Sequence, residues 1–342
     1  MRNPFRPTLV TLVCGCLGTF LSSCNERSSH YYGFEQVAEI PINLEGGVLG
    51  LVSDLSIDRD GNFYVVDRGN HTVYVLDKAG LLVRQVGMEG RGPGELISPS
   101  AISFFEDKLA ILDAGNRRVS FFSMDGHYVS SLPLAGSYLS DIEFNGADKM
   151  IVSESLGMTN YAFYDLTGKR LSPFRKTPIP PVTLPIITKG GQMALRSNGN
   201  ILFSPLREYK VLELSWEGDT LSILHAEPPG YIPPDLSSRE RFSQQEEWAL
   251  VLKPIVLGDM VLIQWASRRG LSEASGTSNW QRYVDLYDSK GRLVQPAIPA
   301  PALFMFARSD RLYAIPSTES ENQNPSIAIY TLKRYIKSKH TE

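Results

Sequence analysis

The sequence predicts an all-β fold, a six-bladed β-propeller of four-stranded antiparallel blades whose ring is closed by an N-terminal strand. Three observations predict it. Short apolar runs recur along the chain between turn residues, which is typical of antiparallel strands and hairpins. Residues 55–87 and 102–134 share one pattern of runs and turns, and weaker copies follow. A period of about 40 to 50 residues with about four strands per unit indicates a propeller blade.

The first two copies correspond residue by residue. Asp67 matches Asp113, Asn70 matches Asn116 and Gly80 matches Gly126, each at an offset of 46 positions. The weaker copies keep the strand spacing and occupy 141–174, 193–224, 255–298 and 304–335. Six copies in total predict six blades.

The N-terminal strand completes the ring in this interpretation. The last copy ends with its third strand near Tyr335, so one outer strand is missing. Residues 33–42, "GFEQVAEIPI", alternate between apolar and polar residues and have no other partner. Pairing them with the last copy covers strand edges that an open array would leave bare. We therefore place the propeller domain at residues 34–336.

The residues before the propeller predict export and lipidation. Arg2 and Arg6 precede an apolar stretch over 8–21, which is too short to span a membrane and suits a signal peptide. It ends in "LSSC", which resembles the lipobox of bacterial lipoproteins. That resemblance implies a signal peptide over 1–23, lipidation of Cys24 and a lipidated tether over 24–33. The alternative is an ordinary signal peptide in which the cysteine occurs by chance.

Composition limits the classes of partner that the protein is expected to bind. Cys14, Cys16 and Cys24 are the three cysteines, so cleavage before Cys24 leaves no thiol for a disulfide, a metal site or a nucleophile. The formal net charge is −3 and no basic run is present, which argues against nucleic-acid binding. We expect a membrane partner through the lipid anchor. Asn25 is not the aspartate associated with inner-membrane retention, so we expect an outer-membrane lipoprotein of the cell envelope, on either face.

The glycine-rich stretch "GMEGRGPGEL", residues 87–96, can be compared with known phosphate-binding loops. A dinucleotide loop needs G-x-G-x-x-G followed by a helix, and a P-loop needs Gly-Lys-Ser or Gly-Lys-Thr. Here Gly90, Gly92 and Gly94 alternate, Pro93 removes a donor and a strand pattern follows. The stretch is therefore predicted to connect the outer edge of one blade to the inner edge of the next.

The blade segments "YVVDRGNHTVYVLDKAG" and "LAILDAGNRRVSFFSMDG" resemble NHL-type repeats. Together with "GRGPGE" and the lipobox, they make the chain similar to the six-bladed β-propeller lipoproteins of the Bacteroidetes. The first two blades carry the resemblance, whereas the later four match mainly in strand spacing. The resemblance implies a fold and leaves the activity open.

Two loop pairs are candidates for structure or for binding. Asp67 and Asp113 each end a strand before Gly-Asn, and we expect them to cap that turn by accepting backbone N–H bonds. The neighbouring residues could instead contribute to a ligand surface where loops of several blades converge on one face. They are Asn70, His71, Asn116 and Arg117.

The sequence assigns no catalytic residue, cofactor or metal. The five histidines, which are scattered without metal-ligand spacing, are His30, His71, His127, His225 and His340. Lactonase-like propellers hold a divalent cation in the central channel. Here only Asp54 and Asp141 are acidic at the predicted starts of the inner strands, a thin supply of oxygen ligands. No G-x-S-x-G motif occurs.

Insertions beyond the basic repeat are the favoured binding region. A helical insertion is predicted at about 228–252, and a polar loop insertion at about 266–281; the stretch 175–191 is irregular. Their aromatic and cationic residues could form a rim for a sugar or a peptide, namely Trp248, Trp280, Arg268 and Arg269. The alternative is that the helix and the tryptophans pack on the propeller and bury apolar area.

Two functions follow from this reading. The first is a binding module for a glycan, a peptide or an envelope protein. The second is a hydrolase or lyase with a divalent metal in the channel. A channel ring rich in Asp, Glu, Asn or His would favour the enzyme, whereas an apolar channel with an exposed aromatic rim would favour binding.

Overall fold

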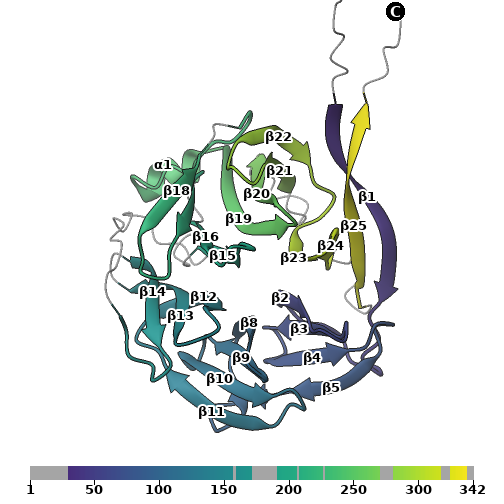
Figure 1. The fold of residues 1–342 in the computed structure, drawn as a ribbon, viewed down its shortest axis with the longest axis vertical. Helices are drawn as coiled ribbons and strands as arrows, with labels where there is room; N and C mark the ends of the chain where they lie inside the picture. Colours follow the sequence, from purple (N-terminus) through teal and green to yellow (C-terminus); the bar gives the residue numbers. More distant parts are fainter. Residues whose placement is uncertain are drawn as a thin grey trace, which may run out of the picture.

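The fold is a ring of six antiparallel β-sheets around a central channel, which makes it an all-β, six-bladed propeller with almost no helix (Figure 1). The computed structural model describes residues 30–156, 159–171, 191–205, 208–225, 228–269, 280–316 and 324–336. The predicted signal peptide, Cys24 and residues 24–29 of the tether lie outside these ranges. Within them, no helix is long and apolar enough to cross a membrane.

Blade order around the ring follows chain order. From the channel outward, the first blade contains β2 (Val52–Ile57), β3 (Phe63–Asp67), β4 (Thr72–Leu76) and β5 (Leu82–Val86). The second contains β8 (Pro99–Phe105), β9 (Lys108–Asp113), β10 (Arg118–Ser123) and β11 (Tyr128–Pro133). The third contains β12 (Ser137–Phe144), β13 (Lys149–Leu156) and β14 (Thr159–Asp165). The strands of the next two blades are β15 (Gln192–Leu195), β16 (Ile201–Ser204), β17 (Val211–Leu214) and β18 (Thr220–Leu224); and β19 (Glu247–Leu257), β20 (Met260–Arg269), β21 (Trp280–Tyr287) and β22 (Leu293–Pro299).

The sixth blade joins the two ends of the described chain. It contains β23 (Phe304–Arg308), β24 (Arg311–Ala314), β25 (Ser326–Ile336) and β1 (His30–Pro41), and β1 pairs antiparallel with β25 as the outer strand. Strand β1 begins at His30, so residues 30–33 are strand rather than the tether expected there. The far ends of β1 and β25 leave the rim together as a two-stranded ribbon (Figure 1).

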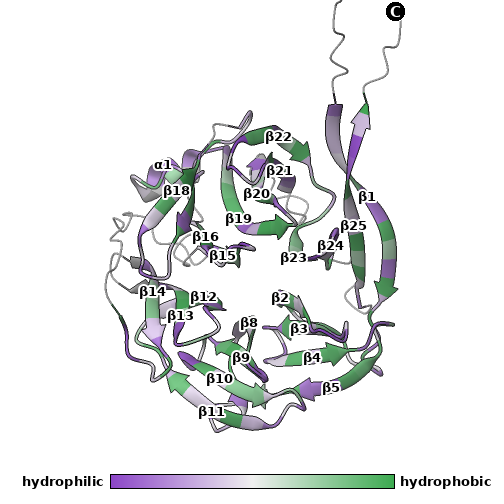
Figure 2. Ribbon diagram, viewed as in Figure 1, coloured by the Kyte–Doolittle hydropathy of each residue, from purple (hydrophilic) through white to green (hydrophobic). Residues whose placement is uncertain are grey.

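The hydrophobic core is divided among the spaces between blades. Six clusters of buried apolar side chains each join two neighbouring blades. The middle strands are therefore covered on both faces, and all five residues of β3 are buried. This explains why "FYVVD" and "LAILD" are continuous apolar runs, which is the pattern of strands buried on both faces. Figure 2 shows the hydrophobic residues concentrated along these strands.

Asp67 caps its turn as predicted. It is fully buried, and its carboxylate accepts from the backbone N–H groups of Gly50 (2.7 Å), Gly69 (2.9 Å) and Asn70 (3.0 Å) and from Asn70 Nδ2 (2.9 Å). Asp113 is equally buried and accepts from Ile97 N, Asn116 Nδ2 and Arg118 Nε, each at 2.8 Å, so side chains rather than turn N–H groups tie it to its hairpin. Each aspartate thus ties its hairpin turn to the segment that enters the same blade.

The glycine-rich stretch connects the first two blades, as expected. Short strands β6 (Met88–Glu89) and β7 (Glu95–Leu96) pair in parallel within it. Its backbone is held by the next blade, because Arg118 Nη2 donates to the carbonyls of Gly92 (2.8 Å) and Glu95 (2.6 Å). Gly94 has φ +79° and lies against Tyr128, so the close approach and the positive φ both favour glycine.

The predicted helical insertion is mostly not helical. Helix α1 (Arg239–Gln244) begins at the N-cap Ser238, whose side chain accepts from Arg241 N. The helix then ends, and the segment from Glu247 onward is the inner strand β19. Pairing with β20 and burial of "WALVL" outweigh the helix propensity of this segment. The loop expected at 266–281 is also shorter, because β20 extends to Arg269 and β21 begins at Trp280.

The two tryptophans of these insertions pack together. Trp248 is 6% exposed and contacts Phe242 of α1 and Trp280, with ring centroids 5.4 and 5.2 Å apart. Trp248 therefore anchors α1 on the fifth blade. The exposed aromatic rim expected from the sequence does not include it.

Removal of β1 should destabilise the ring. A chain that begins at Ile42 loses the partner of β25 and the Phe34 ring, which packs on Phe304 at 4.8 Å. We expect it to unfold at lower urea than a chain that begins at His30, with a loss of at least about 3 kcal/mol. Equal stability of the two chains would contradict closure by β1.

Asp67→Ala should lower the free energy of unfolding by about 2–4 kcal/mol, because several buried N–H donors lose their charged acceptor. Asp60→Ala, at an exposed position of the same blade, should stay within about 0.5 kcal/mol of the parent. Urea unfolding measures both. Similar small losses in the two variants would show that the Asp67 bonds are not needed.

Trp248→Ala should cost about 3–5 kcal/mol, because it leaves a cavity between α1 and the fifth blade. Leu221→Ala removes a side chain that is 53% exposed and should change stability by less than about 0.5 kcal/mol. Chemical denaturation compares the two, and a Trp248→Ala variant as stable as the parent would refute the packing role.

Candidate functional site

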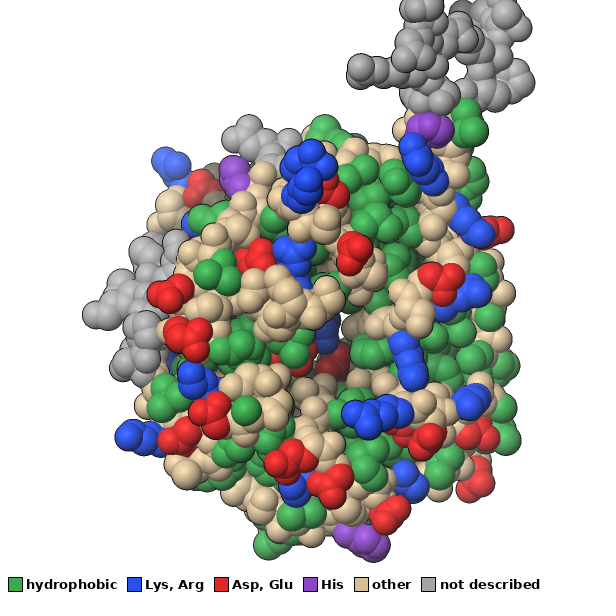
Figure 3. Space-filling view, in the orientation of Figure 1, with side chains coloured by type: hydrophobic (Ala, Val, Ile, Leu, Met, Phe, Trp, Pro, Cys, Tyr) green, Lys and Arg blue, Asp and Glu red, His purple; other side chains and the backbone are tan. Residues whose placement is uncertain are grey.

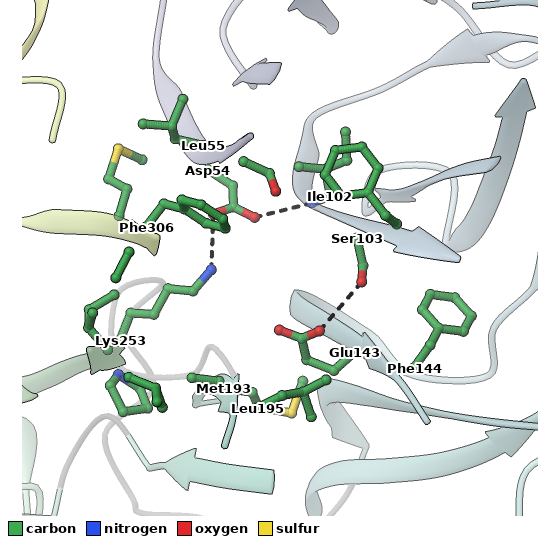
Figure 4. A pocket seen from close by; sticks show the side chains of 18 residues that line it. Asp54, Leu55, Ile102, Ser103, Glu143, Phe144, Met193, Leu195, Lys253 and Phe306 are labelled. Carbon is green, nitrogen blue, oxygen red and sulfur yellow. Dashed lines mark hydrogen bonds and ion pairs between the residues drawn. The ribbon is translucent and has the colours of Figure 1, made fainter. Parts of the chain in front are cut away.

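The inner strands of all six blades surround a cavity of about 320 Å³ in the central channel. The space-filling view shows a hollow at the centre of the ring with acidic and basic side chains inside it (Figure 3). Charged and polar groups at the cavity come from four different blades, namely Asp54, Ser103, Glu143 and Lys253 (Figure 4). The site therefore exists only once the ring is assembled.

Asp54 on β2 joins the first blade to the second. It is 4% exposed, and its Oδ2 accepts from the backbone N–H of Ile102 on β8 at 3.2 Å. Its Oδ1 accepts from Lys253 Nζ at 3.0 Å. The carboxylate thus satisfies one backbone donor of a neighbouring inner strand and one cation across the channel.

Asp141 on β12 joins the third blade to the fourth in the same way. Its Oδ2 accepts from Met193 N on β15 at 2.8 Å, and its Oδ1 accepts from Ile142 N at 2.9 Å. Burial raises the pKa of Asp141 to about 6; Lys253 opposes that shift, and Asp54 adds to it. Asp54 and Asp141 therefore have a structural reason to be present.

Glu143, two residues along β12, has fewer partners. Its carboxylate accepts from Ser103 Oγ at 3.4 Å, the one hydrogen bond described for it. Burial within the ring and the negative charge of Asp141 raise the pKa of Glu143 to about 8. The side chain borders the cavity and keeps partial exposure to it. Glu143 thus borders the cavity and accepts only from the side chain of Ser103 on the neighbouring blade, not from its backbone (Figure 4).

Lys253 supplies the positive charge. Burial lowers the pKa of its ammonium, but Asp141, Asp54 and Glu143 outweigh burial and raise that pKa above its ordinary value. The ammonium is therefore charged at neutral pH. Its role is to compensate the negative charge of the acidic groups in the channel.

Local irregularities in the inner strands decide which side chains face the channel. A register shift separates Val251 from Pro254 on β19, so Lys253 lies within the shift. Comparable shifts lie beside Asp54 on β2 and Asp141 on β12. Such bulges change the direction in which a side chain points. Sequence reasoning placed Asp54 and Asp141 at the channel but missed Glu143, because it considered only the first residues of each inner strand.

The donor set does not fit the divalent-metal site of the alternative enzyme hypothesis. Among the described residues, no group of three or more His, Cys, Asp or Glu side chains could hold a metal ion. Lys253 Nζ is instead bound to Asp54, where a cation would otherwise be held. Asp54 and Asp141 also each use a carboxylate oxygen to accept a hydrogen bond from a backbone N–H group.

Three of the predicted loop residues of the first two blades form side-chain hydrogen bonds with the backbone of neighbouring segments. Asn70 Nδ2 donates to the carbonyl of Val48 at 2.7 Å, and Asn116 Nδ2 donates to that of Gly90 at 2.9 Å. His71 Nδ1 accepts from Ser98 N at 2.8 Å. Arg117 is exposed and has φ +52°, close to the +57° of His71 at the equivalent position. These contacts give Asn70, His71 and Asn116 a role in holding the fold together.

The predicted residues of the fifth blade do come together. Arg268 faces Trp248 across the β19–β20 pair and Trp280 across the β20–β21 pair. Trp248 is buried, whereas Arg268 and Trp280 keep partial exposure. The Arg269 side chain lies outside the described residues. This cluster belongs to a different blade from the two loops above, so the structure does not unite all the predicted ligand residues in one site.

Comparisons with known proteins agree with the fold. The family model described as 6-bladed beta-propeller (DUF5128) matches residues 48–165, which contain the first three blades. A search of curated proteins gave no significant match. Similar solved structures include a duf4221-family protein of Bacteroides vulgatus, at 10% identity and a TM-score of 0.66, over 90% of this chain and 99% of that chain.

Two further structures align over most of their length. An exported protein of Bacteroides fragilis has 14% identity and a TM-score of 0.58, over 89% of this chain and 96% of that chain. Virginiamycin B lyase of Staphylococcus aureus, determined with quinupristin, has 12% identity and a TM-score of 0.50, over 89% and 99%. At these identities the likeness shows the fold alone. The chain is therefore a six-bladed β-propeller whose first three blades are similar to the DUF5128 family.

Proposed function

We propose that this chain is a lipid-anchored protein of the cell envelope whose propeller binds a small ligand in the central channel. The observation that carries the proposal is Glu143, a carboxyl group that borders a cavity and makes no backbone contact with a neighbouring blade. Titratable groups with strongly shifted pKa values in a cavity are typical of functional sites. Asp54, Asp141 and Lys253 surround this group with charge.

The channel residues differ in how far the fold explains them. Asp54 and Asp141 accept backbone N–H bonds from the next blade, and Lys253 compensates their charge. Glu143 is a third acidic side chain in the ring. Its burial beside Asp141 is energetically unfavourable unless its carboxyl group has a further partner. A ligand that interacts with Glu143 supplies that partner.

The proposed anchor leaves the channel accessible. The "LSSC" motif ends at Cys24, six positions before the start of β1 at His30. The ribbon of β1 and β25 projects from the rim of the ring, away from the central opening (Figure 1). A tether attached there holds the propeller by its edge. We also propose that the first two blades are NHL-like repeats and that the anchor lies in the outer membrane, as Asn25 indicates.

Glu143→Gln keeps the size of the side chain and removes its charge. For a chain beginning at His30, we expect members of a panel of amines, carboxylates, sugars and short peptides to raise the melting temperature, because a ligand that binds only the folded state stabilises it. The same compounds should stabilise Glu143→Gln less. Differential scanning fluorimetry measures the shift.

Glu45→Gln is the matched control, because Glu45 is exposed and lies outside the channel. It should respond to the panel as the parent does. The proposal fails if no compound stabilises the parent. It also fails if Glu143→Gln and Glu45→Gln respond identically to every compound that does.

A further inference from the structure

We propose that the channel site recognises an organic cation, a primary ammonium group carried on a compact apolar body, with Glu143 as its main acceptor. This inference rests on the proposed function, since it names the ligand class of the same site. Three independent features of the cavity point to it: its charge balance, the hydrogen-bonding capacity of Glu143 and the apolar side chains around the charged groups.

The charge balance leaves room for one more positive group. Asp54, Asp141 and Glu143 contribute three acidic groups, and Lys253 contributes one cation, which is bound to Asp54 at 3.0 Å. The ammonium of Lys253 also acts on Asp141 and Glu143, so one cation serves three acidic groups. Because charges interact strongly in a partly buried site, a cationic ligand is favoured there over an anionic one.

Glu143 also has hydrogen-bonding capacity to spare. A carboxylate offers about four acceptor positions, and the one described bond, from Ser103 Oγ, is long at 3.4 Å. An ammonium group carries three donors, and charge-assisted N–H···O bonds to carboxylates are stronger than neutral ones. A primary ammonium therefore matches what Glu143 can accept.

Apart from Ser56, the other side chains that line the cavity are apolar, and some are aromatic. Phe104 and Phe306 line it together with Met193 and Leu195. Phe rings attract cations through their faces, and apolar side chains bury the body of a ligand. A volume of about 320 Å³ is at the small end of ligand pockets, which span about 300–1,000 Å³. The site thus suits a small amine with an apolar body.

Binding should depend on pH through Glu143. The groups that face it are Asp141 on the same strand, Lys253 on β19 and Asp54 on β2; the lining residues of β8, β15 and β23 do not titrate. Its pKa of about 8 means that the free site holds a proton at neutral pH, which a cation displaces. Affinity should therefore rise about tenfold from pH 6 to 7 and about fivefold from pH 7 to 8, and level off above pH 8.

The test compares three probes of similar shape and different charge: 2-phenylethylamine, 2-phenylethanol and 3-phenylpropionate. Isothermal titration calorimetry with the chain beginning at His30 should show the amine binding at least tenfold more tightly than the alcohol at pH 8. The anion should bind more weakly than both. Titrations in buffers of different ionisation heat should show release of close to one proton near pH 7.

The variants separate a charge effect from a structural one. Glu143→Gln should lower amine affinity at least tenfold, remove the pH dependence and leave alcohol affinity unchanged, whereas Glu45→Gln should bind like the parent. Equal binding of amine and alcohol, tighter binding of the anion, or an unchanged pH dependence in Glu143→Gln would overturn the inference. If the panel stabilises the protein through Glu143 but 2-phenylethylamine does not bind, the inference alone fails. If no panel compound binds, the proposed function fails with it.

Discussion

The propeller depends on satisfying the strand edges that face the channel. The inner strand of each blade has backbone N–H and C=O groups with no further strand beside them, and buried polar groups of this kind need partners. Here side chains provide them between neighbouring blades. Asp54 accepts from Ile102 N, Asp141 from Met193 N, and Gln264 Oε1 from Phe304 N. These bonds join the first blade to the second, the third to the fourth and the fifth to the sixth.

This solution brings charge into the centre of the ring. Two of the three acceptors are aspartates, and Lys253 from the fifth blade reaches Asp54 across the channel. The charges therefore have a structural origin, and we propose a ligand site there because Glu143 adds a carboxyl group that accepts no backbone bond from a neighbouring blade. A second buried acid, Asp285, shows the contrast: Ala297 N, Trp265 Nε1 and Tyr209 O–H all donate to it, away from the cavity.

The outer surface of the ring and its centre serve different purposes. The N-terminal strand completes the sixth blade on the outside, and the ribbon it forms with β25 leaves from the rim (Figure 1). Side chains of β1 pack in the clusters that flank the sixth blade, and these clusters include residues of the inner strands β2 and β19. Attachment and ligand binding are proposed at separate places on the ring, one at the rim and one at the centre.

The sequence by itself determined the repeat, the number of blades and the capping role of Asp67, because those features depend on local strand and turn patterns. Only the tertiary structure decided that the segment after α1 is a strand, since pairing with β20 overrides local propensity. It also decided the site: register shifts in the inner strands set which side chains face the channel, and ring closure brings Glu143 and Lys253 together from distant blades.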